Sequence, residues 1–251
     1  MGKKDKHCCR DAEARYPPGA PGFAVASPYL IESPLLRWAF IRKVYVIVAM
    51  QLMLTVAVAA TVNLVDPIRA FFLSRTKEAI IAFIVILISP IIAVMIPMIF
   101  CRKKHPINLV LLALFTVCIS LSVGLGCLSR NGIVIMEAAG ITMVVVVGLT
   151  LYTFWAAKKG YDFEFLGPFL VAALLVLMLF SLVRILFPMG KTATMVYGCV
   201  AALVFSGFII YDTDNLIKRY TYDEYVSAAI ELYLDIINLF MAILSILEGS
   251  E

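Results

Sequence analysis

The sequence predicts an all-α polytopic membrane protein, a bundle of seven transmembrane helices. Of its 251 residues, 63% are hydrophobic and only 15% are charged, which leaves too little polar surface for a water-soluble domain of this size. Seven apolar runs are each long enough to cross about 30 Å of hydrocarbon as a helix. None of them alternates with a period of two residues, as the strands of a transmembrane barrel would.

The seven runs follow one another with short connectors. Polar links such as CRKKHP, SRNG and PMGK leave no room for a soluble domain between runs, so residues 37–251 are predicted to form one transmembrane domain. The segment SPLLRWAFIRKVY before the first run mixes aromatic and basic residues, which is typical of a membrane interface. The runs cover roughly residues 44–65, 79–100, 107–128, 133–156, 166–187, 193–213 and 226–247.

The first 36 residues differ from the rest of the chain. They are charged and rich in proline and glycine, and they are predicted to be a disordered tail without a signal peptide. Cys8 and Cys9 are adjacent in this tail and are interpreted as plain thiols, with palmitoylation as the alternative. The four other cysteines (Cys101, Cys118, Cys127 and Cys199) are scattered in or beside the apolar runs without metal-ligand spacing, which argues against a zinc site or a disulfide framework. The net charge of +4 is modest and indicates membrane topology, with no nucleic-acid partner.

Basic residues predict the orientation. Most Lys and Arg residues of the connectors fall in the segments before runs 1, 3, 5 and 7, which share one side of the membrane. The positive-inside rule places these segments, and with them the N-terminus, in the cytosol. An odd number of spans then places the C-terminus on the lumenal or external side.

A polar stripe in the last apolar run, IELYLDIINLF, predicts a functional site. Asp235 lies nine residues into this run, which is roughly 14 Å of helix and close to the bilayer centre. Glu231 lies one turn before it and Asn238 one turn after it. A carboxylate at this depth costs about 2.5–3.5 kcal/mol on insertion, and such residues usually mark ion or proton paths. A stripe that only hydrogen-bonds neighbouring helices is the alternative.

A second acid belongs with this stripe. Asp212, in GFIIYDTDNLIKRY, lies near the end of the sixth run, and the short turn that follows should make the last two helices antiparallel neighbours. Asp212 and Asp235 are therefore expected to face each other. Two carboxylates in a low dielectric cannot both ionise cheaply, so such a pair can share a proton, bind a hard cation such as Ca²⁺, or exchange the two.

Two further acids are weaker candidates for lining an ion path. Asp214 lies nearer the membrane surface, where we expect it to be solvated or to cap the turn. Glu137 lies about five residues inside the fourth run, so an interfacial position competes with a role in a pore.

Three segments resemble the transmembrane Bax inhibitor motif family, in particular its plant Lifeguard branch. They are ESPLLRWAFIRKVYVIVAMQLMLTVAVAA, GITMVVVVGLTLYTFWAAKKGYDFEFLGPFL and GFIIYDTDNLIKRYTYDEYVSAAIELYLDIINLF, and the resemblance covers about residues 32–247. It implies a seven-helix bundle of the endoplasmic reticulum or other endomembranes, with the plasma membrane as an alternative. It also implies a pH-sensitive Ca²⁺ leak that suppresses stress-induced cell death, with the bilayer, Ca²⁺, H⁺ and membrane proteins of cell-death control as partners.

The resemblance also assigns residues. The proton- and calcium-responsive aspartates of the family match Asp212 and Asp235, and no tightly bound cofactor is implied. A bacterial member uses an arginine on its second helix as a latch to this pair. The second run here contains no internal arginine, and Arg102 at its end is the candidate for that role.

Other functions fit the sequence less well. An intramembrane aspartyl protease would share the Tyr-Asp of IYDTD but needs Gly-x-Gly-Asp on the next helix, where Asp235 follows LYL. The chain is therefore not expected to be an enzyme. A G-protein-coupled receptor needs an external N-terminus. A non-conducting membrane protein that regulates cell death through partners stays open, as does the choice between a leak channel and an exchanger.

Overall fold

The interfacial segment and the first apolar run form a single continuous helix, α1 (Pro34–Leu64), in the computed structural model of the protein. The structure describes residues 34–74, 76–89, 107–187 and 190–250. Nearly all of the predicted tail 1–36, and the candidate latch Arg102, lie outside these ranges. Residues 33–251 form one compact unit.

Most residues of the described part of the chain are helical, and none of them is in a strand. Six of these helices, α1 and α5 to α9, are long and apolar enough to cross a membrane. The second predicted run is represented by α3, and its remainder lies outside the described residues. Following α1, the elements are α2 (Asp66–Leu73), α3 (Lys77–Ser89), α5 (Ile107–Gly126), α6 (Gly132–Lys158), α7 (Leu166–Leu186), α8 (Lys191–Lys218), the 3₁₀ turn η3 (Tyr222–Glu224) and α9 (Tyr225–Ser250).

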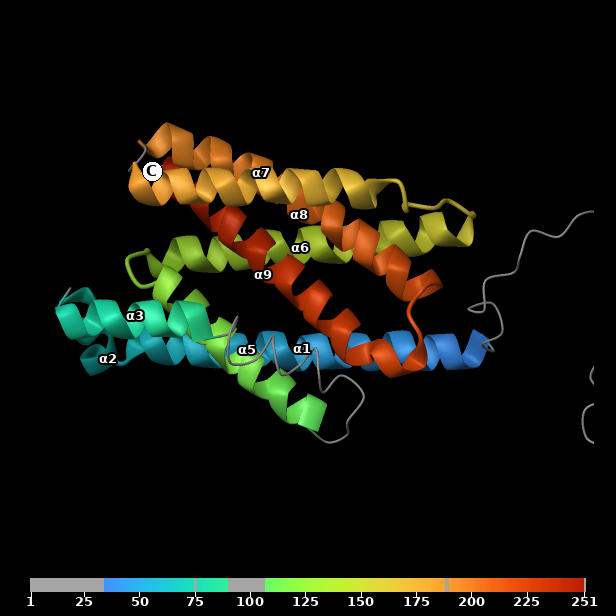
Figure 1. The fold of residues 1–251 in the computed structure, drawn as a ribbon, viewed down its shortest axis with the longest axis horizontal. Helices are drawn as coiled ribbons and strands as arrows, with labels where there is room; N and C mark the ends of the chain where they lie inside the picture. Colours follow the sequence, from blue (N-terminus) through green and yellow to red (C-terminus); the bar gives the residue numbers. More distant parts are fainter. Residues whose placement is uncertain (1–33, 75, 90–106, 188–189, 251) are drawn as a thin grey trace, which may run out of the picture. The chain divides into compact units, whose positions relative to one another are not determined.

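The last helix, α9, lies at the centre of the bundle. It contacts α1, α5, α6 and α8, and Figure 1 shows it running obliquely between α1 and α8. Of the residues in the 18-residue apolar window of α9, 56% are buried, whereas the corresponding share is 17–39% in the other five candidate spans. The outer helices turn large apolar side chains outward, among them Val144 (73% exposed) and Leu203 (76% exposed). An apolar exterior around a partly polar centre suits a helical bundle in lipid.

A layer of buried hydroxyl and amide groups joins α1, α5 and α9. Gln51 Nε2 donates to Thr116 Oγ1 at 3.0 Å, which ties α1 to α5. Thr55 Oγ1 lies 2.8 Å from Tyr233 Oη and accepts from Ser120 Oγ at 3.0 Å. Each of these side chains is at most 4% exposed. Inter-helix hydrogen bonds of this kind contribute about 0.6 kcal/mol each in membranes, so the layer specifies helix pairing more than it adds stability.

The connectors gather at two ends of the bundle. At one end, the Arg37 guanidinium donates to the Tyr220 carbonyl oxygen at 2.5 Å, and Lys218 pairs with the α6–α7 loop. At the other end, Arg130 of the α5–α6 connector pairs with Glu248 near the end of α9. This grouping agrees with the predicted alternation of connectors. The cytosolic location of the first end, called here the α8–α9 turn end, stays a prediction.

Candidate functional site

The turn between α8 and α9 positions the candidate site. α8 runs on to Lys218, and the chain reverses within a few residues. The side chain of Glu224 accepts from the backbone N of Thr221 at 3.1 Å and from its hydroxyl at 3.0 Å, forming a capping box at the start of η3. The reversal is therefore fixed locally, and it sets the register in which α8 and α9 pack along their length.

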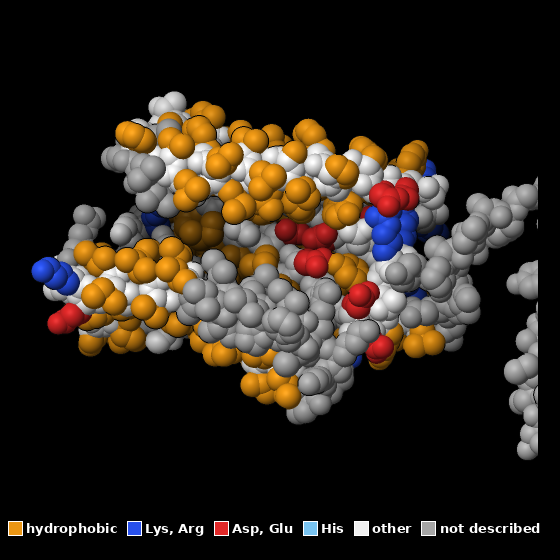
Figure 2. Space-filling model, viewed as in Figure 1, with side chains coloured by type: hydrophobic (Ala, Val, Ile, Leu, Met, Phe, Trp, Pro, Cys, Tyr) orange, Lys and Arg blue, Asp and Glu red, His pale blue; other side chains and the backbone are white. Residues whose placement is uncertain are grey.

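A cavity of about 650 Å³ lies between α7, α8 and α9. One wall is apolar, and the other carries the polar side chains of α8 and α9. Figure 2 shows acidic side chains gathered in the middle of a face that is otherwise largely apolar. The lining residues are Leu174, Leu177, Met178, Ser181, Leu182, Tyr197, Phe205, Phe208, Asp212, Glu231, Leu234, Asp235 and Asn238.

The structure brings together Asp212 and Asp235, 23 residues apart in the sequence. Both side chains line the same cavity and act electrostatically on each other. Two neighbouring carboxyl groups in a low dielectric cannot both ionise cheaply, so one of them is expected to hold a proton. Asp235 is 7% exposed, and its Oδ2 has no hydrogen-bond partner among the described residues. Asp212 also interacts electrostatically with the Asn215 side chain. The pair can therefore hold a proton, or release it and present carboxylate oxygens to a cation.

Glu231 and Asn238 line the same cavity on either side of Asp235. The Tyr220 hydroxyl donates to Glu231 Oε2. Burial raises the pKa of Tyr220, and the neighbouring Glu231 carboxylate raises it further, so this phenol stays a proton donor. Asn238 Nδ2 donates to the Leu234 carbonyl oxygen at 2.8 Å, which leaves its side-chain oxygen as the group that can accept or ligate.

Asp214 is not solvated, contrary to the prediction, and it does not line the cavity. It is fully buried, and its Oδ1 pairs with Lys218 Nζ at 2.6 Å while Oδ2 accepts from the Phe163 backbone N at 3.3 Å. Two residues along a helix rotate a side chain by about 200°, so Asp214 faces away from the side that carries Asp212. Glu137 is also absent from the lining and lies exposed on α6.

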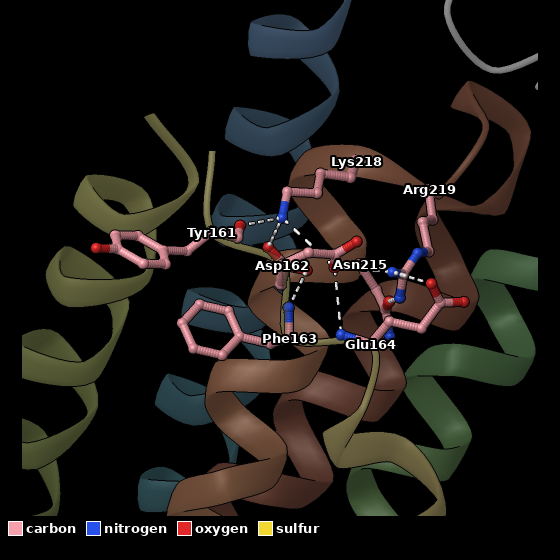
Figure 3. A network of polar contacts seen from close by, with 8 residues as sticks. Tyr161, Asp162, Phe163, Glu164, Asn215, Lys218 and Arg219 are labelled. Atoms are coloured by element: carbon pink, nitrogen blue, oxygen red, sulfur yellow. Dashed lines mark hydrogen bonds and ion pairs between the residues drawn. The ribbon is translucent and has the colours of Figure 1, made fainter. Parts of the chain in front are cut away.

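A charged network at the α8–α9 turn end connects α8 to the α6–α7 loop (Figure 3). Arg219 Nη2 lies 2.9 Å from Asp162 Oδ1 and 3.2 Å from Glu164 Oε2, and its Nη1 donates to Asn215 Oδ1 at 2.7 Å. Burial acts to raise the pKa of Asp162, but a hydrogen bond with Asp214 and the two cations lower it overall. Asn215 also interacts electrostatically with Asp212, so this network lies next to the aspartate pair.

The loop is set up by the end of α6. Gly160 has φ of +85°, a left-handed conformation that favours glycine. Gly160 N donates to the Ala157 carbonyl oxygen and Tyr161 N to that of Ala156, which together form a Schellman motif. Sequence reasoning missed the contributions of Asn215, Arg219 and this loop. The dense charges of YDFE and IKRY indicated a polar surface, but nothing in them pairs one segment with the other.

The site offers few side chains that could bind a metal ion. Within the described ranges, no group of three or more His, Cys, Asp or Glu side chains is arranged to hold a metal ion. The part of the cavity lining that the structure describes includes no Lys or Arg. The arrangement therefore suits brief cation contact with two carboxyl groups, with the remaining ligands from water or carbonyl groups, and it does not suit tight storage.

Comparison with known proteins identifies the family. Residues 37–251 match the model of the family described as "Inhibitor of apoptosis-promoting Bax1". The chain is 58% identical to Protein LIFEGUARD 4 of Arabidopsis thaliana over 224 residues, covering 89% of this chain and 90% of that protein. It is 54% identical to Protein LIFEGUARD 2 of the same plant, covering 88% and 92%. It is also 40% identical to a Golgi anti-apoptotic protein of vaccinia virus (strain Lister), covering 91% of each. The chain belongs to the Bax inhibitor family, as its motifs predicted.

Proposed function

We propose that the protein is a proton-regulated Ca²⁺ leak of endomembranes that limits stress-induced cell death. The observation that carries the proposal is the pair of Asp212 and Asp235, two interacting carboxyl groups on the wall of one cavity among apolar helices. Intramembrane carboxyl groups are expensive and usually mark ion or proton paths. Family membership adds the expectation of a role in cell death.

The pair has two chemical states that differ in what they attract. With a shared proton, the two carboxyl groups bond each other and draw α8 and α9 together at this depth. Without it, the like charges repel, and a hard cation with oxygen preference is the natural counter-charge. Glu231, at the same cavity wall, supplies a further acidic group on the path toward the α8–α9 turn end. The same two aspartates thus make cation passage depend on pH.

The sparse ligand set favours a leak over a tight binding site. Two carboxylates supply only part of the six to eight oxygen ligands that Ca²⁺ takes, so the ion is held weakly and can leave again. Asn215 interacts electrostatically with Asp212 and accepts a hydrogen bond from Arg219, so the pair lies next to the charged network of the α8–α9 turn end. We assign no catalytic role to these residues.

Flux of Ca²⁺ into liposomes containing the purified protein tests the proposal. The variants are Asp212→Asn and Asp235→Asn, with Asp223→Asn as the matched control because it makes the same change at an exposed position of the turn. We expect pH-dependent flux in the wild type and the control, and loss of that dependence in both pair variants. Unchanged flux in both pair variants would overturn the role of the pair.

A second candidate is a non-conducting interaction protein of cell-death control. It is favoured by the likeness to a viral protein named for its anti-apoptotic role alone. The liposome assay separates the two candidates, because an interaction protein gives no flux in the absence of partners. An imposed pH gradient then separates a leak from an exchanger, since only an exchanger moves Ca²⁺ against its own gradient.

A further inference from the structure

A second concave site lies on the outer surface of the bundle, away from the aspartate pair. It is a groove of about 580 Å³ between the start of α1 and the last turns of α6 and α8. These three helix ends meet at the α8–α9 turn end, where Arg37 holds the Tyr220 carbonyl oxygen. The lining residues are Arg37, Trp38, Ile41, Phe154, Trp155, Ala157, Lys158 and Ile217, called here the interfacial groove.

The interfacial groove has an apolar floor, and exposed tryptophan side chains lie at its edge. Trp38 stacks on Phe154 with ring centroids 5.9 Å apart and stays 62% exposed, and Trp155 is 52% exposed. Exposed tryptophans at the ends of transmembrane helices lie at the level of the lipid headgroups. The groove therefore opens at the depth where the acyl chains of a phospholipid meet its glycerol and phosphate.

The charge of the groove is of one sign. Its described lining includes two cations, Arg37 and Lys158, and no carboxylate. The Arg37 guanidinium is held by two carbonyl oxygens, those of Tyr220 at 2.5 Å and Lys218 at 3.4 Å, so it is positioned without its charge being neutralised by them. Lys159, next along α6, lies 4.3 Å from the centre of the Trp155 ring and adds to the positive potential.

We propose that the interfacial groove binds an anionic glycerophospholipid, with its phosphate between Arg37 and Lys158. Its acyl chains lie along the apolar floor that Ile41, Phe154 and Ile217 provide. Basic pockets between transmembrane helices at a membrane interface are suited to anionic headgroups. A simple aromatic anchor, the reading that the N-terminal segment invites by itself, explains the tryptophans but not two cations that converge on one groove from different helices.

The tryptophans provide a direct probe. The chain has two, Trp38 and Trp155, and both line the groove. The full-length protein is reconstituted in phosphatidylcholine vesicles that contain a small fraction of lipid brominated near the glycerol backbone. That lipid is phosphatidylserine or phosphatidylinositol in one arm and phosphatidylcholine in the other. Bromine quenches tryptophan fluorescence on contact, so the ratio of quenching between the arms measures headgroup preference at this groove.

The expected result is a clear preference for the anionic lipid that depends on Lys158. One basic residue near the surface contributes about a fivefold difference in lipid affinity, so Lys158→Gln should reduce the preference by about that factor. Arg42→Gln is the matched control, because Arg42 is exposed on α1 near the same end but does not line the groove.

Two results would overturn the proposal. Equal quenching by anionic and zwitterionic lipids in the wild type would show that the groove has no headgroup preference. Equal losses in Lys158→Gln and Arg42→Gln would show that general surface charge, and no built site, attracts the lipid. Because the readout is quenching, either result leaves the assignment of the aspartate pair untouched.

Discussion

A single methyl group at Gly198 tests how closely α8 packs on α9. A Cβ built at this glycine lies 2.9 Å from the Ala242 carbonyl oxygen and 2.9 Å from Ile246 Cγ1, with Ile246 N at 3.2 Å. Ordinary van der Waals contact begins at 3.4 Å, so the backbone of α9 must move by about 0.5 Å to accept it. Small residues that let helix backbones approach are a general feature of packing in membranes.

Two opposing effects decide the size of the change. Replacing a helical glycine by alanine favours the helix by about 0.5–1 kcal/mol. Overpacking a well-filled contact costs about 1–3 kcal/mol, and two of the three close atoms here, Ala242 O and Ile246 N, are backbone atoms that cannot rotate away. We therefore expect Gly198→Ala to lower the free energy of unfolding by about 1 kcal/mol. Gly148→Ala on α6 is the control, because nothing lies within 4 Å of its Cβ, so the helix gain should remain.

Unfolding in mixed micelles, with dodecyl sulfate as the denaturant and helicity as the signal, gives both values under one set of conditions. The expected order of stability is Gly148→Ala, wild type, Gly198→Ala. If Gly198→Ala were as stable as Gly148→Ala, the close contact between α8 and α9 would be wrong. The depth match of Asp212 and Asp235, which depends on the same helix pair, would then need to be measured independently.

Two further predictions concern the α8–α9 turn end. The pKa of Tyr220 is raised, so the stability that its neutral phenol contributes is complete below the ordinary tyrosine pKa of about 10 and is lost as the pH rises further. The free energy of unfolding should therefore fall less between about pH 9 and about pH 11 in Tyr220→Phe than in the wild type. Tyr161→Phe, whose ring is 59% exposed, should follow the wild type, and equal losses in all three proteins would contradict the assignment. Arg219→Gln should accelerate hydrogen exchange of the α6–α7 loop amides while changing the free energy of unfolding by less than about 1 kcal/mol, because exposed ion pairs contribute little. Lys159→Gln is its control, and loop exchange that stays as slow as in the wild type would show that Arg219 does not hold the loop.

The placement of Asp212 and Asp235 on one cavity wall could be predicted because each step of the reasoning used only local sequence. Apolar runs gave the depth of each acid through the helical rise, and a short turn made the two helices antiparallel neighbours. The structure adds what fixes this register, a capping box at Thr221 and Glu224. The short helix α2 was not predicted. It is too short to cross a membrane, so the search for apolar runs of spanning length does not find it.

The surroundings of Asp214 and of the interfacial groove could not be predicted from the sequence. Asp214 is buried because the Phe163 backbone N reaches it from a loop 51 residues away, and no local pattern encodes that approach. Trp38 and Trp155 each look like single interfacial anchors in the sequence. Only packing of α1 against α6 places both in one groove with cations from two helices. Contacts that depend on the relative placement of distant helices are thus the part that periodicity and depth leave undetermined.

Asp212 and Asp214 are two acids of α8 with different surroundings, and the difference bears on the proposed role of the cavity pair. The two acids lie two residues apart on α8, and the chain supplies Asp214 with a cation, Lys218, one turn along the same helix. A buried acid can therefore be neutralised within α8 itself. On the opposite face, Asp212 meets a second acid, Asp235, at a wall whose described lining includes no Lys or Arg. Because unpaired buried charge is costly, the proposed proton or cation would supply the counter-charge that the described lining of this cavity does not include.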